Sequence, residues 1–138
     1  MLDALTARSL VEDATGAVLR LALPWIRALP LAAVQDVEVH IDGVPVPHLR
    51  VVLGQRGIAP ADLAHEDGWW FVQDRLALRL GRRLSAGTHS VRVSFRLAVP
   101  YLQTGPDGPL ILPFHFARDL DLDTVTPGAS ADVARDVA

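Results

Sequence analysis

The side chains that could carry out acid–base or metal chemistry are few and lie far apart in the sequence. The five histidines show neither an H-x-H nor an H-E-x-x-H spacing. They are His40, His48, His65, His89 and His115. The tightest cluster, His65-Glu66-Asp67, is typical of a solvated loop. The histidines therefore do not predict a metal site.

An acidic run near the C-terminus follows calcium-loop spacing only at its start. Asp119, Asp121 and Asp123 alternate as D-x-D-x-D. The sixth position is then Thr124, where a calcium loop requires glycine, and the twelfth is Ser130, where it requires a bidentate glutamate. We interpret the run as a solvated acidic segment.

Nucleophiles and bases of the common kinds are also missing. The chain has no cysteine, which excludes thiolate nucleophiles and disulfides. It has no lysine, so Schiff-base chemistry is excluded as well. No serine lies in a G-x-S-x-G elbow, and no glycine-rich loop precedes a helix. We predict that this chain carries no catalytic residue, no metal site and no cofactor of its own.

Composition narrows the class of protein. The 138 residues are half hydrophobic and 21% charged, which suits one globular domain with a sizeable core. A net charge of −3 argues against a nucleic-acid surface, which needs clustered positive charge. The N-terminus lacks the long apolar run of a signal peptide, and no segment is long enough to span a bilayer. We therefore expect a cytoplasmic protein with no membrane contact.

Short alternating runs separated by Gly, Pro and Asp predict an all-β chain. We expect strands near residues 9–13, 17–23, 34–41, 49–53, 69–73, 75–80, 89–99 and 110–116. Thr15-Gly16 and Asp42-Gly43 are turn signals, and residues 60–65 predict one helical turn that begins with proline. The fold class is a two-sheet antiparallel β-sandwich of about eight strands. Residues 1–118 form its single domain, and residues 119–138 form a C-terminal tail that is partly disordered or bound to a partner.

An unusually apolar loop precedes the strand at 34–41. Trp25, Ile26, Leu29 and Leu31 lie close together between prolines, with Arg27 as the only charge. Connections are normally polar and lie at the surface. Two interpretations stay open: the loop folds over the open end of its own sandwich, or it docks onto another chain.

Two further segments carry clustered aromatic or proline residues. In Trp69-Trp70-Phe71, neighbouring side chains of a strand point to opposite faces, so one tryptophan is expected in the core and the other at the surface. In residues 97–115, four prolines preset the shape of a loop that holds the only tyrosine, Tyr101. The alternative for that segment is an ordinary hairpin tip between two sandwich strands.

Taken together, these motifs resemble the small beta subunit of bacterial C-glycoside deglycosidases over residues 11–101. The resemblance rests on motifs whose order and spacing are more specific than any one of them. They are Leu23-Pro24-Trp25, Arg27, Leu29-Pro30-Leu31, Val37, Val39, Ile41, Asp42-Gly43, Trp70-Phe71, Leu84, Gly87, His89 and Pro100-Tyr101.

The resemblance implies a lyase complex that cleaves the C–C bond between a 3-oxo sugar and an aromatic aglycone. Loss of the acidified C2 proton gives an enolate, which expels the aryl group from C1 by β-elimination. A divalent metal, expected to be Mn²⁺, would polarise the ketone in a TIM-barrel alpha subunit that also supplies the base. This chain would then be an accessory subunit without a cofactor of its own.

Given this resemblance, the apolar loop and the proline-rich segment suggest roles for individual residues. Partner-interface candidates are Trp25, Ile26, Leu29, Leu31, Pro100 and Leu102. Candidates for a substrate pocket, which would hold a 3-oxo C-glucoside, are Tyr101 and His115. The alternative function, from a different class, is a stand-alone β-sandwich module that binds carbohydrate or another protein.

Overall fold

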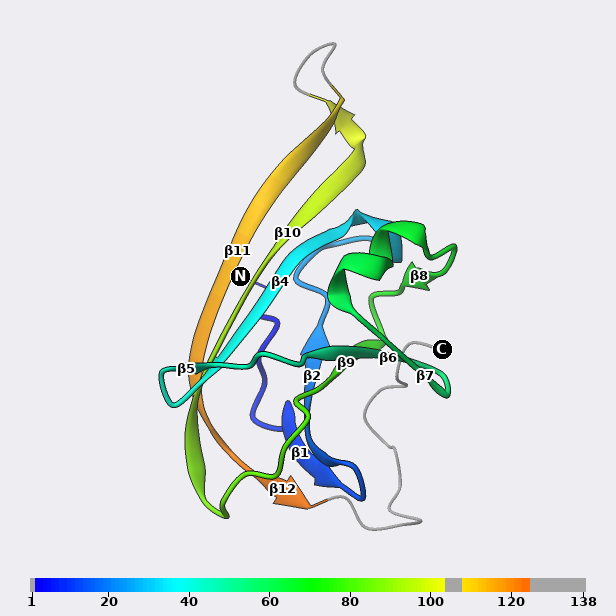
Figure 1. The fold of residues 1–138 in the computed structure, drawn as a ribbon. Helices are drawn as coiled ribbons and strands as arrows, with labels where there is room; N and C mark the ends of the chain where they lie inside the picture. The colour runs from blue at the N-terminus through cyan, green and yellow to red at the C-terminus, as the bar shows by residue number, and fades with distance from the viewer. Residues whose placement is uncertain (1, 104–107, 125–138) are drawn as a thin grey trace.

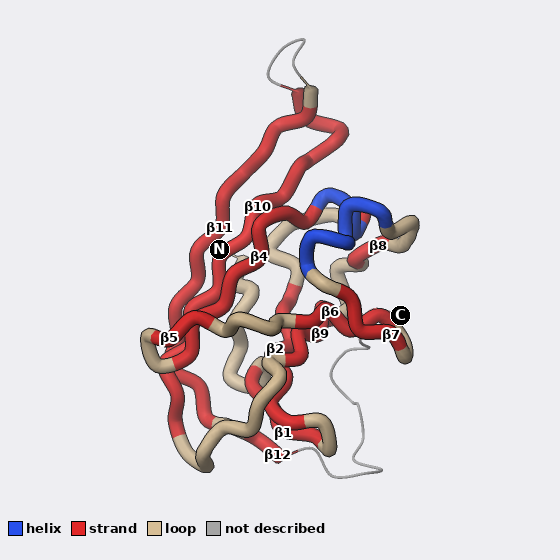
Figure 2. The backbone as a smooth tube through the Cα atoms, in the orientation of Figure 1, coloured by secondary structure: helices blue, strands red, loops and turns tan. Residues whose placement is uncertain are grey.

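The computed structural model of this chain describes residues 2–103 and 108–124, with the backbone alone for residues 100–103 and 124. Nearly all of these residues lie in strands or the turns that join them (Figures 1 and 2). The strands are β1 (Leu10–Asp13), β2 (Gly16–Ala22), β3 (Leu29–Pro30), β4 (Val34–Ile41), β5 (Val44–Pro45), β6 (Arg50–Leu53), β7 (Arg56–Ile58), β8 (Trp69–Trp70), β9 (Arg75–Arg79), β10 (Thr88–Gln103), β11 (Pro109–Asp121) and β12 (Asp123–Thr124). Two 3-10 helices, η1 (Leu31–Ala33) and η2 (Pro60–His65), lie beside β8.

The strands form two main sheets, which confirms the predicted all-β sandwich. One sheet has six strands in the order β12-β1-β2-β9-β6-β7, and the other has four in the order β11-β10-β4-β5. All pairs are antiparallel except β1 with β12, which run parallel. A separate two-stranded ribbon pairs β3 with β8. The core lies between the two sheets and reaches under this ribbon.

The strand β4 contains a bulge that the alternating sequence pattern only partly indicated. Val37, Val39 and Ile41 are buried, as the period of two predicts, but Val34 is buried too and is out of phase with them. The register with β10 shifts between Ser94 and Arg96, and Asp36 adopts a positive φ of 54° at that point. The extra residue restores the inward direction of Val34.

Aromatic packing joins the ribbon to the four-stranded sheet. Trp70 of β8 is fully buried, and its ring lies 6.2 Å from that of Phe95 in β10. Phe95 in turn stacks on Phe114 of β11 at 5.8 Å, and Phe114 stacks on Phe116 at 6.1 Å. Aromatic pairs at these separations contribute beyond the area they bury. Trp70 is thus held at one end of a continuous aromatic row.

Several predicted boundaries are corrected by the structure. The expected strand 69–73 ends at Trp70, because the Asp74 amide donates to the Phe71 carbonyl and closes a turn. The expected proline-rich loop is largely an extension of the β10–β11 hairpin, which projects beyond the sandwich (Figure 1). Its tip, residues 104–107, lies outside the described residues.

The domain also continues past residue 118, where the tail was expected to begin. Leu120 is buried in the core, and Asp123 pairs with Val11. The chain thereby crosses from one sheet to the other, because alternating leucines in DLDLD fill the inner face. Residues 125–138, the rest of the predicted tail, lie outside the described residues.

The turn signals are confirmed, and one of them positions a buried histidine. Asp42 and Gly43 both have positive φ, at 52° and 80°, as a tight hairpin turn requires. His89 Nδ1 lies 2.7 Å from Asp42 Oδ2, and His89 Nε2 lies 2.7 Å from the Ser85 carbonyl oxygen. A carbonyl and an ionised carboxylate only accept hydrogen bonds, so this geometry is fully satisfied when both ring nitrogens carry protons.

These contacts change the ionisation of both side chains. The Ser85 carbonyl and then the Asp42 carboxylate raise the pKa of His89 above its usual value, while burial opposes this. The hydrogen bonds from His89 and from the Ser90 amide lower the pKa of Asp42. The pair links the β4–β5 turn, β10 and the segment before β10 into one unit.

We expect the free energy of unfolding to depend on pH through this pair. A histidine whose pKa is raised by folding stabilises the fold fully below its unfolded pKa of about 6.5, and this stabilisation is lost as the pH rises through the folded value. Asp42, with a lowered pKa, contributes above its unfolded pKa of about 3.9, and its contribution is lost as the pH falls. Urea titrations from pH 5 to 9 should therefore show a free energy of unfolding that declines as the pH rises above about 6.5.

A matched pair of variants separates this effect from other titrations. His89→Gln should flatten this decline in the free energy of unfolding with pH. His65→Gln, at an exposed position in η2, should preserve the decline. An unchanged pH profile in the His89 variant would show that the buried imidazole is neutral in the fold.

Candidate partner-binding surface

The β3–β8 ribbon fixes the direction of the side chains at one corner of the molecule. Leu29 pairs with Trp70, and both side chains are fully buried. Pro30 pairs with Trp69, one residue out of phase, so these side chains point to the opposite face. Trp69 is 48% exposed. The prediction that one tryptophan is in the core and the other at the surface is confirmed.

Large apolar side chains gather on the outward side of this corner. Phe71, the first residue after β8, is also exposed, at 43%. Val72 follows in the turn, and Ile26 lies in the loop that leads into β3. Ile26 is 75% exposed, the highest value among the exposed large apolar residues. We call Ile26, Trp69, Phe71 and Val72 the ribbon patch.

Contacts within the chain hold the ribbon patch in place. The Trp70 indole Nε1–H donates to the Asp74 carbonyl at 3.3 Å, and the Asp74 amide donates to the Phe71 carbonyl at 3.0 Å. On the other side of the ribbon, the Leu31 amide donates to the Gly68 carbonyl. Gly68 lies close to the Leu31 side chain, where an added Cβ would approach it to 3.0 Å. The backbone under the exposed side chains is therefore well defined.

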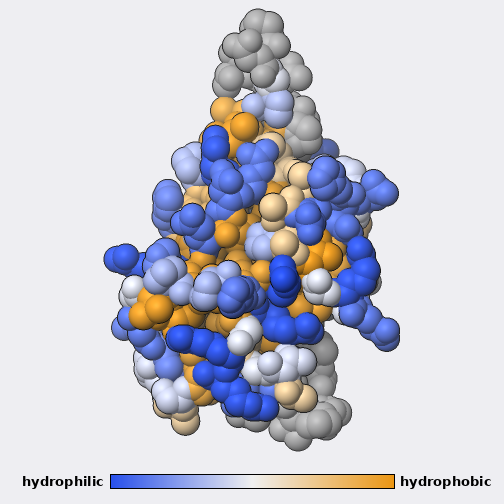
Figure 3. Space-filling model, viewed as in Figure 1, coloured by the Kyte–Doolittle hydropathy of each residue, from blue (hydrophilic) through white to orange (hydrophobic). Residues whose placement is uncertain are grey.

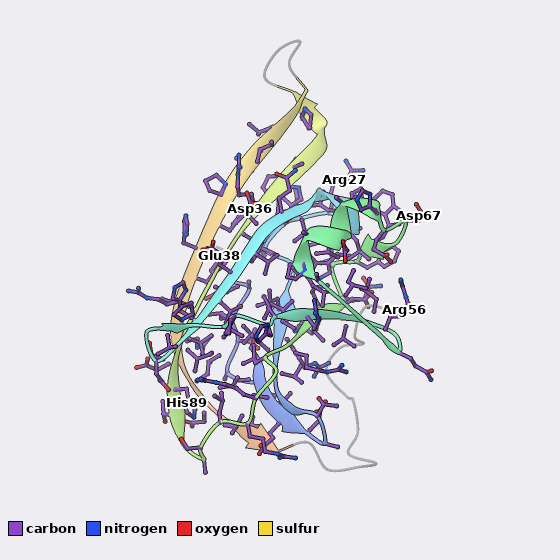
Figure 4. The ribbon with its side chains drawn as sticks, viewed as in Figure 1. Arg27, Asp36, Glu38, Arg56, Asp67 and His89 are labelled. Carbon is purple, nitrogen blue, oxygen red and sulfur yellow. The ribbon has the colours of Figure 1, made fainter. Side chains whose placement is uncertain are left out.

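Charged side chains surround this corner of the structure. Arg27 and Asp67 lie on either side of the region near β8 in Figure 4, and Arg56 lies below it. The Arg56 guanidinium forms an ion pair with Glu66 at 2.6 Å, which lowers the pKa of Glu66. An apolar centre with a charged border is the usual organisation of a protein–protein contact. On the face of the molecule that Figure 3 shows, hydrophilic and apolar side chains are mixed over short distances.

The predicted interface residues separate into two groups. Leu29 and Leu31 lie in this chain's own core at 0% and 1% exposure, so they have no surface to offer a partner. Trp25 is partly buried against the same core. Ile26 alone of these four points fully into solvent. The loop therefore covers its own sandwich through three side chains, and the sequence pattern did not distinguish them from the fourth.

Pro100 and Leu102 belong to the end of β10, and their side chains lie outside the described part of the chain, so their interface role stays a prediction. Phe71 and Val72 were not predicted as surface residues, because the expected strand continued through them. The turn signal Gln73-Asp74 directly after them was the available clue.

The two substrate-pocket candidates are not brought together. His115 is exposed on the outer face of β11, opposite Ser94 of β10. Tyr101 comes seven residues after Ser94, which places it about 20 Å further along the hairpin, and its side chain is outside the described residues. The role of Tyr101 and His115 at a substrate pocket therefore stays a prediction.

His115 instead lines a shallow depression on the outer face of the four-stranded sheet. Its polar side chains are His40, Arg92, Ser94 and His115, contributed by three adjacent strands. They offer hydrogen-bond donors and a positive charge to an anionic or phenolic oxygen. Among residues 2–103 and 108–124, no group of three or more His, Asp or Glu side chains is placed to hold a metal ion.

Among the described residues, no helix is long and apolar enough to cross a bilayer.

No protein-family model matches the chain. Comparison with curated proteins does find relatives. The 3'-dehydrocarminate deglycosidase beta subunit of a Microbacterium species is 36% identical over 98 residues, which cover 68% of this chain and 74% of the relative.

Two further relatives come from Arthrobacter globiformis, and both are C-glycoside deglycosidase beta subunits. One is 33% identical over 113 residues, covering 73% of this chain and 86% of the relative. The other is 32% identical over 93 residues, covering 64% and 71%. The likeness extends over most of each chain at identities above 30%, and it agrees with the motifs singled out in the sequence. The chain belongs to the C-glycoside deglycosidase beta subunit family.

Proposed function

We propose that this chain is the accessory beta subunit of a hetero-oligomeric C-glycoside deglycosidase that cleaves the C–C bond of 3-oxo C-glucosides with aromatic aglycones. The observation that carries the proposal is the 36% identity to a beta subunit over 74% of that relative's length. The name of that relative specifies a substrate oxidised at the 3' position, which supports the same oxidation state for the substrate here.

The reaction follows from the position of the ketone. A carbonyl at C3 acidifies the proton on C2, and a base removes that proton to give an enolate. The enolate then expels the aryl group from C1, so the C1–aryl bond breaks and a C1–C2 double bond forms. The aryl group takes up a proton as it leaves. Atoms and charge balance without an external oxidant or reductant.

The described residues offer no set of side chains of the kind that such an elimination requires. A metal that assists enolisation needs several converging ligands, and no such set occurs in the part of the chain that the structure describes. The residues present therefore do not fit Mn²⁺. We assign the metal and the base to the alpha subunit, for which we propose a TIM barrel. The beta subunit would cover the mouth of the barrel and border the aglycone pocket.

A specific role for His115 remains part of this proposal. Its exposed imidazole and the neighbouring Arg92 face outward on one sheet, and such donors suit the phenolic oxygens of an aglycone. Tyr101 is proposed as an aromatic surface near the hairpin end.

We predict that the isolated chain has no deglycosidase activity and that activity appears on co-expression with the alpha subunit of the same genome. The reason is that the base and the metal ligands belong to the other chain. Assays with a 3-oxo C-glucoside should compare the beta subunit, the alpha subunit and the complex at equal concentrations. Turnover by the isolated beta subunit that survives a chelator would contradict the assignment.

Metal removal tests the division of labour separately. Treating the complex with a chelator should abolish turnover while the subunits stay associated on size exclusion, and added Mn²⁺ should restore activity. Isothermal titration of Mn²⁺ into the isolated beta subunit should give no stoichiometric binding. Tight binding of one Mn²⁺ per beta chain would place the metal in this subunit and overturn this part of the proposal.

A further inference from the structure

We infer that the ribbon patch, formed by Ile26, Trp69, Phe71 and Val72, is the surface through which this chain docks onto the alpha subunit. The inference rests on the proposed function, because it takes the alpha subunit as the occupant. It deepens that function by naming the docking site. Of the four apolar loop residues predicted from the sequence as interface, this site keeps only Ile26.

The exposure of apolar side chains is concentrated at this corner. Seven large hydrophobic residues are exposed among those described, and four of them make up the ribbon patch. The other three, Leu2, Val44 and Ile111, are dispersed over the N-terminus, β5 and β11. Scattered apolar residues are normal on a protein surface, whereas a contiguous group indicates a contact site. Aromatic residues such as Trp69 are also the type that anchors interfaces.

The backbone beneath the ribbon patch is fixed before any partner arrives. Trp70 is locked into the core against Phe95, and its indole holds the carbonyl that ends the turn. Trp70 points inward, and Trp69 and Phe71 on either side of it are both exposed. A preordered surface loses little conformational entropy on binding. The aromatic side chains of the ribbon patch can therefore bind a partner with a small loss of conformational entropy.

The kinship with beta subunits favours a different partner chain over a second copy of this chain, because a beta subunit implies another subunit. Four side chains make up only part of the roughly 800 Å² per partner that a stable complex buries. The occupant must therefore also enclose the flanks, including η2 and Arg27. The ribbon lies at the outer edge of the molecule (Figures 1 and 2).

The test compares ribbon variants with matched controls in assembly with the alpha subunit. Trp69→Ala and Phe71→Ala, combined in one chain, should weaken the Kd for the alpha subunit by about 30-fold or more, as expected for buried aromatic anchors. Ile26→Glu, in a loop outside the strands, should weaken it in the same direction. Val44→Ala, an equally exposed apolar position on β5, should change the Kd less than threefold.

Two readouts distinguish docking from damage to the fold. The variants should unfold at the same temperature as the wild type when isolated. At saturating concentrations of the double variant, kcat should return to the wild-type value, because the patch affects association and not chemistry. A kcat that stays low at saturation, or a lowered melting temperature, would overturn the docking role.

The remaining outcomes separate this inference from the proposed function. If wild-type chains assemble into an active complex and the ribbon variants assemble equally well, the docking surface lies elsewhere and the proposed function stands. If the isolated wild type is a dimer that the variants split, the occupant is a second copy and the inference fails. If the wild type neither binds the alpha subunit nor supports turnover, the proposed function fails and the inference fails with it.

Discussion

The burial of Trp70 determines which side chains the β3–β8 ribbon exposes. Trp70 packs against Phe95 in the core, the alternation of the strand then turns Trp69 outward, and Phe71 is exposed in the turn that follows. Exchanging the phase of the ribbon by one residue would bury Trp69 and expose Trp70 together with Leu29. The core contacts of Trp70 therefore select the surface that the chain presents, as well as stabilising the ribbon.

The rest of the sandwich supports that arrangement at a distance. The aromatic row from Phe95 to Phe116 couples the ribbon to the long β10–β11 hairpin. At the opposite end of β10, His89 joins the β4–β5 turn through Asp42. The polar and aromatic contacts of the chain thus stabilise its scaffold. Its described residues contain no set of side chains that could hold a metal ion.

The sequence predicted the fold class and most strands because alternation over β4 and β10 is strong. It predicted the contrast between Trp69 and Trp70 for the same reason. It could not separate Leu29 and Leu31 from Ile26, because apolar residues in an irregular loop carry no period that assigns a face. It also continued a strand through Phe71 and Val72, since a turn formed by one backbone hydrogen bond outweighed their strand propensity. The sign of the bulge at Asp36 in the sequence is that Val34 is out of phase with the other apolar residues of β4. The pairing of β4 with β10 was needed to explain it.

Hydrogen–deuterium exchange of this chain with and without the alpha subunit tests the central claim most directly, because it reports which backbone amides the partner covers. The account predicts slower exchange at residues 25–28 and 71–73, around the ribbon, with little change at the β4–β5 turn. Protection confined to β5 or to the outer edge of β11, with unchanged exchange at the ribbon, would contradict it.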